Sequence, residues 1–232
     1  MSSSMISFAI VIFTSAVSLA TTPMDCFESS SGKIVRYHCF ESEQNVEIPA
    51  EINGLPVVAI GNGAFYRLPG DGKLKSIKIP NSITSIGNRA FAFNSLAEVI
   101  IPNSVVTIGD SAFAWNQIQK AVIPNSVTAI GNSAFEHNEL TNIVIPNSVQ
   151  SIGSYAFNYN SLNQISIPNS ISALEPGVFN RNDLTEVLIP DSVKSIGELA
   201  FTENHLTSVV VPNSVLRLHR NSFDSNVEVI RK

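Results

Sequence analysis

Residues 123–144 read IPNSVTAIGNSAFEHNELTNIV, and the same pattern recurs along most of the 232-residue chain. Ile-Pro begins at Ile79, and Ile-Pro or Val-Pro then returns every 22 residues as far as Val211. A fixed period of this length indicates a repeat architecture, in which each unit buries its apolar edge by stacking on its neighbours. We number the positions of each unit from the first residue of this dipeptide.

Each unit contains two short apolar segments. Positions 18, 21 and 1, as in Leu96, Val99 and Ile101, predict a strand that turns alternate side chains inward. Positions 5 and 8, as in Val127 and Ile130, predict a second short segment, and the glycine at position 9 allows a tight corner after it. We therefore expect a solenoid with strands on one face and with short strands, turns and single helical turns on the other.

Two columns of the repeat are expected to lie inside the solenoid as scaffold. Phenylalanine at position 13 can stack from unit to unit, and the amide of asparagine at position 16 can satisfy backbone groups that would otherwise be buried unpaired. The phenylalanines are Phe91, Phe113, Phe135, Phe157, Phe179 and Phe201, and the asparagines are Asn94, Asn116, Asn138, Asn160, Asn182, Asn204 and Asn226.

One pattern, LxxVxIPxSVxxIGxxAFxxN, summarises the repeat. It is carried by Leu140, Val144–Pro146, Ser148–Val149, Ile152–Gly153 and Ala156–Phe157, and by their equivalents in the other units. This pattern resembles the BspA-type, or treponemal-type, leucine-rich repeat. The resemblance implies a right-handed leucine-rich-repeat superhelix, an α/β-type repeat solenoid that is mostly β. It also implies an exported or surface-exposed protein that binds other proteins, since adhesins are known among such relatives.

The resemblance covers about residues 46–232. Before it, an uncharged stretch from Ile6 to Ala20 ends in small residues, which is typical of a signal peptide cleaved before Thr21. A retained membrane anchor is the alternative. The expected divisions are a signal peptide at 1–20, an N-terminal cap at 21–47 and a leucine-rich-repeat domain at 48–232, comprising an irregular coil at 48–78, six repeats at 79–210 and a C-terminal capping repeat at 211–232.

The fifth unit departs from the pattern. Glu175-Pro176-Gly177 displaces the glycine of position 9. We expect the coil to be distorted there.

Two cysteines, Cys26 and Cys39, follow the predicted cleavage site. In an exported chain they can form a disulfide that closes a short loop, whereas two reduced, buried thiols are the alternative. A metal site is not expected, because the two thiols and His38 do not complete a tetrahedral set of ligands.

Composition and motifs exclude several classes of function. The net charge of -5 and the lack of a basic run argue against nucleic acid, and the periodic apolar residues argue against disorder. His137, His205 and His219 occupy different positions of the repeat, and no nucleophile, base and acid converge, so we predict no enzymatic activity. We also predict no cofactor, and no transmembrane span in the mature chain.

Position 22 is predicted to face outward, since it lies between two inward positions of the strand. Its apolar members form a stripe with the mixed polar residues of position 20 beside it, as expected of a protein-binding face. The alternative is that β-branched residues simply suit strands. The apolar members are Ile100, Val122, Val144, Leu188 and Val210, with Ser166 at the same position of the fourth unit.

Position 15 places rings on four successive units, namely Phe93, Trp115, His137 and Tyr159. Such a column can hold apolar loops of a partner or the faces of sugar rings. Alternatively, the rings stabilise this flank of the solenoid by stacking on one another.

The sequence thus favours an exported leucine-rich-repeat protein that mediates protein–protein interaction, including adhesion at a cell surface. Its location would be secreted, surface-bound or periplasmic. A carbohydrate-binding module that uses the aromatic column, and a periplasmic structural scaffold, are the alternatives.

Overall fold

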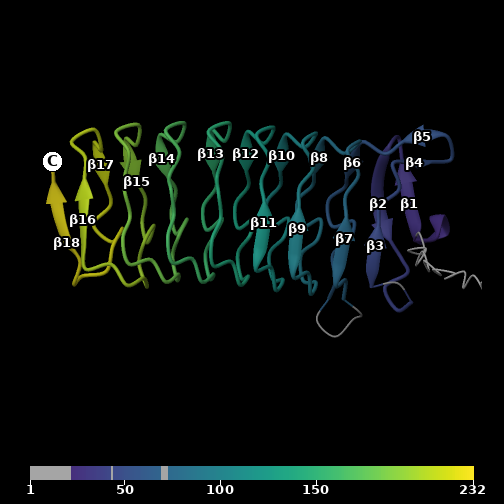
Figure 1. The fold of residues 1–232 in the computed structure, drawn as a ribbon, viewed down its shortest axis with the longest axis horizontal. Coiled ribbons are helices and arrows are strands. Elements are labelled where there is room, and N and C mark those ends of the chain that lie inside the picture. Colours follow the sequence, from purple (N-terminus) through teal and green to yellow (C-terminus); the bar gives the residue numbers. More distant parts are fainter. Residues whose placement is uncertain (1–21, 43, 69–72) are drawn as a thin grey trace, which may run out of the picture.

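The computed structural model describes residues 22–42, 44–68 and 73–232, which form an extended solenoid (Figure 1). About nine turns stack side by side, nearly all of the regular structure is β, and one short helix, η1 (Met24–Cys26), precedes the strands of the described residues. This confirms the predicted mostly-β leucine-rich-repeat solenoid. The predicted signal peptide, residues 1–20, lies outside the described residues.

The first sheet is built from positions 7 and 8 of successive turns, which pair in parallel with no shift of register, as in Thr107 opposite Ala129. At its N-terminal end, β1 (Phe27–Ser30) adds an antiparallel strand to β2 (Lys33–Tyr37). The remaining strands on this face are β6 (Ala59–Ile60), β8 (Ser85–Ile86), β10 (Thr107–Ile108), β12 (Ala129–Ile130), β13 (Ser151–Ile152), β14 (Ala173–Leu174), β15 (Ser195–Ile196) and β17 (Arg217–Leu218).

The second face is built from positions 20 to 22. Its strands pair in parallel as β3 with β7, β9 with β11 and β16 with β18. Between β11 and β16 the described chain forms only one isolated bridge on this face, from Ser166 to Leu188. The strands are β3 (Asn45–Glu47), β7 (Ser76–Lys78), β9 (Glu98–Ile100), β11 (Lys120–Val122), β16 (Ser208–Val211) and β18 (Glu228–Arg231), and a separate antiparallel hairpin is formed by β4 (Glu51–Ile52) and β5 (Leu55–Pro56).

The solenoid has one turn more than the eight that begin with Ile-Pro or Val-Pro. The additional turn comes from the segment before Ile48, because β2 pairs with β6 in the first sheet and β3 pairs with β7 on the second face. The segment also closes the N-terminal end of the core. Cys26 and Cys39 are joined by a disulfide, and Tyr37 stacks on Phe65 with 5.3 Å between ring centroids.

The core is an uninterrupted phenylalanine column. Phe65 through Phe223 stack with ring centroids 4.9–5.8 Å apart, and the rings between them are fully buried. The asparagines of position 16 lie beside this column and bond the backbone of adjacent turns. Asn226 is an exception, since it is exposed. It lies in the last turn, which is two residues shorter than the regular 22-residue units, as shown by the pairing of Val210 with Ile230.

The glycine of position 9 has a different purpose from the one that the sequence suggests. A Cβ atom on Gly131 would lie 2.6 Å from the backbone nitrogen of Asp110 in the preceding turn, and the other glycines of this column are equally crowded. In these turns glycine therefore serves the close approach of adjacent turns rather than the conformational freedom of a tight corner. The last turn has His219 at this position and keeps the same amide bond, to Ile196 at 3.0 Å.

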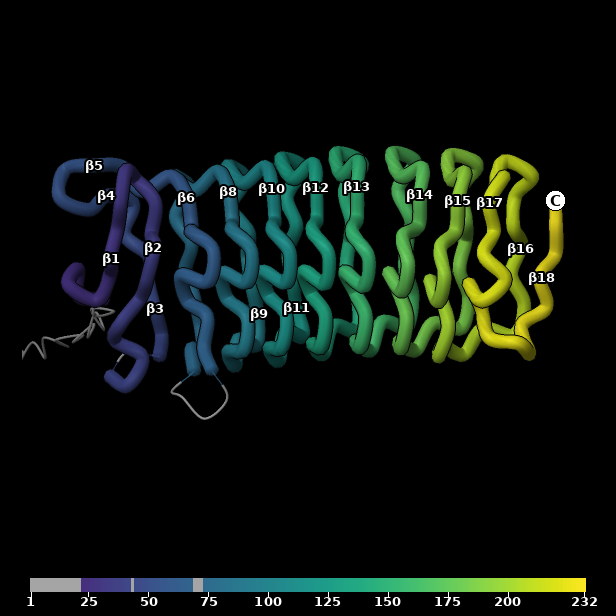
Figure 2. Tube along the Cα trace, turned by 180° about the vertical axis from the view of Figure 1, so that it is seen from behind, coloured from purple at the N-terminus to yellow at the C-terminus, as the bar shows by residue number. Residues whose placement is uncertain are grey.

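The expected distortion of the fifth unit is confirmed. The first sheet divides between β13 and β14, where Glu175 occupies the position of the glycine, and Figure 2 shows these turns set further apart than their neighbours. Elsewhere the position 9 amide donates to the preceding turn, as from Gly153 to Ile130 at 2.9 Å. Among the described residues, no such bond joins Glu175 to Ile152.

Candidate interaction surfaces

The apolar residues of position 22 lie on one exposed face of the solenoid, which we term the apolar stripe. The backbone register places them in line, with Ile100 opposite Val122, while the intervening Val99 is buried. Val144 is 74% exposed and Leu188 is 81% exposed, and the other three members are 42–62% exposed. The stripe comprises Ile100, Val122, Val144, Leu188 and Val210.

The stripe continues beyond the residues that its repeat position identifies. Ile230 pairs with Val210 and is also exposed, although the shorter last turn gives it a different position number. At the other end, Lys78 directly precedes Ile79 and so corresponds to position 22, and it forms an ion pair with Glu47 at 2.5 Å. The apolar surface therefore runs from Ile100 to Ile230 and has a charged boundary on its N-terminal side. Counting in units of 22 residues misses Ile230.

A groove of about 610 Å³ opens on the stripe at the fourth unit. Its floor is apolar, and it includes the buried Ile143 and Ile165. Val144 and Leu188 line it on either side of Ser166, the small member of position 22. The polar residues that line it are Asn142, Gln164 and Glu186.

The rings of position 15 form a continuous stack, which we term the aromatic ladder. Ring centroids are 5.5 Å apart between Phe93 and Trp115, 3.7 Å between Trp115 and His137, and 4.1 Å between His137 and Tyr159. These ring planes lie within 5–19° of parallel, so each inner ring has a neighbour on both faces. The guanidinium of Arg181 covers the remaining face of Tyr159 at 4.3 Å.

The ladder ends in charge at one side and in an aromatic edge at the other. Arg181 forms an ion pair with Glu203, with 2.8 Å between Nε and Oε1. Tyr66 packs its ring against Phe93 in an edge-on arrangement at 5.7 Å. Sequence reasoning omitted Tyr66 because it belongs to the irregular turn before the regular repeats.

The backbone beneath the ladder is left-handed at every rung. The φ angles are 62° at Phe93, 58° at Trp115 and 53° at both His137 and Tyr159. This conformation favours Gly or Asn and costs other residues about 1–2 kcal/mol each. Arg181 and Glu203 have the same conformation at position 15 of the next two units, so the turn imposes it and the aromatic identity of the column does not follow from backbone preference.

His137 is enclosed between Trp115 and Tyr159. Burial lowers the pKa of its imidazole below the ordinary value of 6.5, the negative charge of Glu136 acts in the opposite direction, and Arg181 lowers the pKa further. Burial in the stack therefore favours the neutral form of His137.

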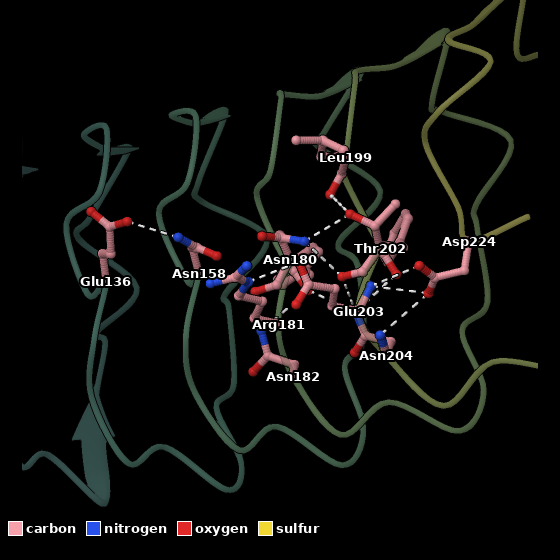
Figure 3. A network of polar contacts seen from close by, with 12 residues as sticks. Glu136, Asn158, Asn180, Arg181, Asn182, Leu199, Thr202, Glu203, Asn204 and Asp224 are labelled. Atoms are coloured by element: carbon pink, nitrogen blue, oxygen red, sulfur yellow. Dashed lines mark hydrogen bonds and ion pairs between the residues drawn. The ribbon is translucent and has the colours of Figure 1, made fainter.

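A polar network underlies the C-terminal part of the ladder (Figure 3). Asn158 donates to Glu136 at 2.7 Å, and Asn180 donates to the Thr202 hydroxyl at 2.7 Å. The Asp224 carboxylate accepts from the Glu203 amide at 2.9 Å. Except for Glu203, the residues that form these bonds all lie at position 14 of the repeat. The sequence analysis did not identify this position as polar, because alanines occupy it in the first two regular units.

The sequence analysis predicted neither a metal centre nor a set of catalytic residues. Within the described ranges no group of three or more His, Cys, Asp or Glu side chains could hold a metal ion. No helix in the described part of the chain combines the length and the hydropathy that crossing a bilayer requires.

Comparison with models of protein families identifies the family of this chain. The model of the BspA type leucine rich repeat region matches six copies, over residues 33–149 and 106–229. The chain belongs to the BspA-type leucine-rich repeat family. Leucine-rich repeats are generally scaffolds for protein interaction. No curated protein matches the chain.

One of the solved leucine-rich repeat structures that resemble this BspA-type chain shares its fold, with a TM-score above 0.5. A leucine-rich repeat protein from Bacteroides ovatus superposes with a TM-score of 0.68 at 24% identity, covering 88% of this chain and 64% of that one. A leucine rich cell surface protein from Faecalibacterium prausnitzii gives 0.44 at 22% identity, with 89% and 74% covered. The T. pallidum Leucine Rich Repeat protein gives 0.40 at 23% identity, with 91% and 85% covered. This chain therefore spans about 64% of the length of the Bacteroides ovatus protein.

Proposed function

We propose that the protein is exported and binds a protein partner through the apolar stripe, at or near a cell surface. The observation that carries the proposal is the alignment of exposed apolar side chains from Ile100 to Ile230 on one face. Polar residues of position 20, such as Lys120 and Glu186, lie beside them. An apolar centre with a polar rim is the usual composition of a protein interface.

The strand preference of β-branched residues does not account for the stripe. Its two most exposed members, Val144 and Leu188, lie outside the assigned strands, and leucine is not β-branched. A preference for strand-forming residues would therefore have the least effect at Val144 and Leu188. Their exposure is better explained by contact with a partner.

The aromatic ladder gives less support to a carbohydrate-binding role. A sugar ring that stacks on an aromatic side chain needs a free ring face. In the ladder, Trp115 and His137 cover each other, and Arg181 covers Tyr159. This arrangement favours the structural interpretation of the ladder.

The test is binding of the purified protein to whole cells and to extracellular matrix proteins. The double variant Val122→Lys/Val144→Lys should reduce binding by about tenfold or more, because it places two charges in the apolar centre. Val106→Lys is the matched control, since Val106 is as exposed as Val122 but lies next to the first sheet, where Lys194 occupies the same repeat position. Equal binding by the double variant and the control would overturn the proposal.

Location and partner class need separate measurements. Fractionation of the producing cells should find the protein outside the cytoplasm, and sequencing of its N-terminus should begin at Thr21. Protease treatment of the target cells should abolish binding. Competition by soluble glycans would instead indicate a carbohydrate ligand, and the absence of any external binding would indicate a periplasmic scaffold.

A further inference from the structure

The apolar stripe is interrupted at one position, and the interruption is a formed groove. Ser166 stands where the other regular units carry Ile, Val or Leu. Its neighbours along the stripe, Val144 and Leu188, are the two most exposed apolar residues on this face. The small side chain therefore leaves a gap between two projecting apolar walls.

The groove at Ser166 has the lining of a receptor for a large apolar side chain. Its volume of about 610 Å³ lies within the range of roughly 300–1,000 Å³ of small-molecule pockets, so it has room for such a side chain together with the residue beside it. Ile143 and Ile165 provide an apolar floor, so a side chain that entered would lose contact with water on several sides. Buried anchor residues of this kind contribute most of the binding energy in protein interfaces.

The rim of the groove carries one charge. The carboxylate of Glu186 is exposed and forms no ion pair within the described residues. The amides of Asn142 and Gln164 are the other polar groups of the lining. A cationic group beside the apolar anchor would complement this rim, whereas an anionic group would be repelled.

The first sheet also divides at the junction of the fourth and fifth units, between β13 and β14. On the second face these units keep the isolated bridge from Ser166 to Leu188, which is the one pairing between β11 and β16 in the described chain. The groove lies on this second face. The division of the first sheet thus falls at the units that form this recess of the stripe.

We propose that the partner docks by inserting one aromatic or large aliphatic side chain over Ser166, between Val144 and Leu188, with a Lys or Arg beside it that pairs with Glu186. This inference rests on the proposed function, since it names the anchoring point of the same surface. The occupant is a segment of a protein partner with an apolar residue next to a basic one.

The decisive variant is Ser166→Leu, which completes the stripe and fills the groove. Leucine is already present at this position in the fifth unit, so the fold should tolerate it. We expect Ser166→Leu to weaken binding to the target cells by about tenfold, while Ser166→Ala, which leaves the groove open, stays within about twofold of the wild type. Equal or tighter binding by Ser166→Leu would show that the partner lies flat on the stripe.

A small probe tests the chemistry of the groove without the partner. Tryptamine combines an indole with an ammonium group, and indole-3-acetate carries the same ring with the opposite charge. In NMR titrations, tryptamine should shift the amide signals of Val144, Ser166 and Leu188 at lower concentration than indole-3-acetate, and Glu186→Gln should remove the difference. Equal response to both probes, or no response, would overturn the cationic anchor.

The two proposals fail in different ways. If Val122→Lys/Val144→Lys leaves cell binding unchanged, the stripe is not the interface and the anchor proposal fails with it. If that variant loses binding while Ser166→Leu keeps it, the stripe stands and the anchor at Ser166 is rejected.

Discussion

The amide nitrogen of Asn138 donates a hydrogen bond to the carbonyl oxygen of Phe113 in the preceding turn, at 3.0 Å. The same nitrogen donates to Phe135 in its own turn at 3.1 Å, and its amide oxygen accepts from the backbone nitrogen of Ile118 at 3.0 Å. Two of these three bonds join the turn of Asn138 to the preceding turn. The bonds recur from Asn94 to Asn204, so the asparagine column holds the stack together beside the phenylalanines.

Replacing Asn138 by Ala should destabilise the protein by about 3 kcal/mol. The backbone nitrogen of Ile118 would be left buried without a partner, at a cost of about 1–3 kcal/mol for an unsatisfied group, and the carbonyls of Phe113 and Phe135 would each lose one of two side-chain donors. Urea unfolding measures the change. Asn226→Ala is the control, because Asn226 shares the repeat position but is exposed, and it should change stability by less than about 0.5 kcal/mol. Equal effects of the two variants would contradict the role of the column.

Replacing Glu175 by Gly should join the two halves of the first sheet. A Cβ atom at position 9 would meet the backbone of the preceding turn at 2.5–2.8 Å in the regular units that carry glycine, so its removal from residue 175 should favour the close approach. His219, at the same position of the last turn, keeps its amide bond to Ile196 at 3.0 Å, so the Ala variant is needed to test the steric effect. The amide of residue 175 could then donate to Ile152, as Gly197 does to Leu174 at 2.8 Å. Hydrogen exchange at this amide should slow by about tenfold or more. Glu175→Ala keeps the Cβ atom and should leave exchange unchanged, and identical behaviour of the Gly and Ala variants would sink the steric explanation.

The period of the sequence predicted the regular part of the fold because each column repeats one physical task. Alternation around Val99 predicted which residues of the second face are buried, and the recurrence of phenylalanine predicted the central column. The displaced glycine at Glu175 predicted a local distortion. These features depend on side chains that meet the same residue type in the next turn.

Features that arise where the chain departs from the 22-residue period could not be predicted from the sequence in this way. The outward position of Ile230 follows from a last turn that is two residues shorter, and this became visible only in the register of β16 and β18. The left-handed backbone at Trp115 could not be predicted from its residue type, since Gly or Asn is the usual indication of this conformation and Trp is not. The groove at Ser166 arises from the shape of three adjacent turns, which no single repeat encodes.

Stability should fall on acidification in a manner that depends on His137. Burial between Trp115 and Tyr159 lowers its pKa in the folded state, whereas the unfolded chain has the ordinary value of 6.5. Below pH 6.5 the unfolded state therefore takes up the proton more readily, so stability is lost until the pH passes the lowered pKa of the folded state. Above pH 6.5 the contribution is constant.

Urea unfolding at pH 8 and pH 5 measures this loss, and His137→Phe is the comparison. Phenylalanine keeps an aromatic rung but does not titrate, so the variant should lose less stability between the two pH values than the wild type. Other titrating groups contribute equally to both proteins. The same loss in both would show that His137 is not the responsible group.

The ladder is expected to stabilise the solenoid rather than to bind the partner. Trp115 stacks on Phe93 and on His137, and each aromatic pair contributes about 0.5–1.5 kcal/mol beyond the area that it buries. Trp115→Ala should therefore lower the free energy of unfolding by about 2 kcal/mol, while Trp115→Phe should lower it by less because a ring remains. In the folded double variant Trp115→Ala/Tyr159→Ala, cell binding should stay within about twofold of the wild type. Loss of binding by this variant, with the stripe intact, would place the partner on the ladder. The hypothesis that the aromatic column is a binding surface would then stand.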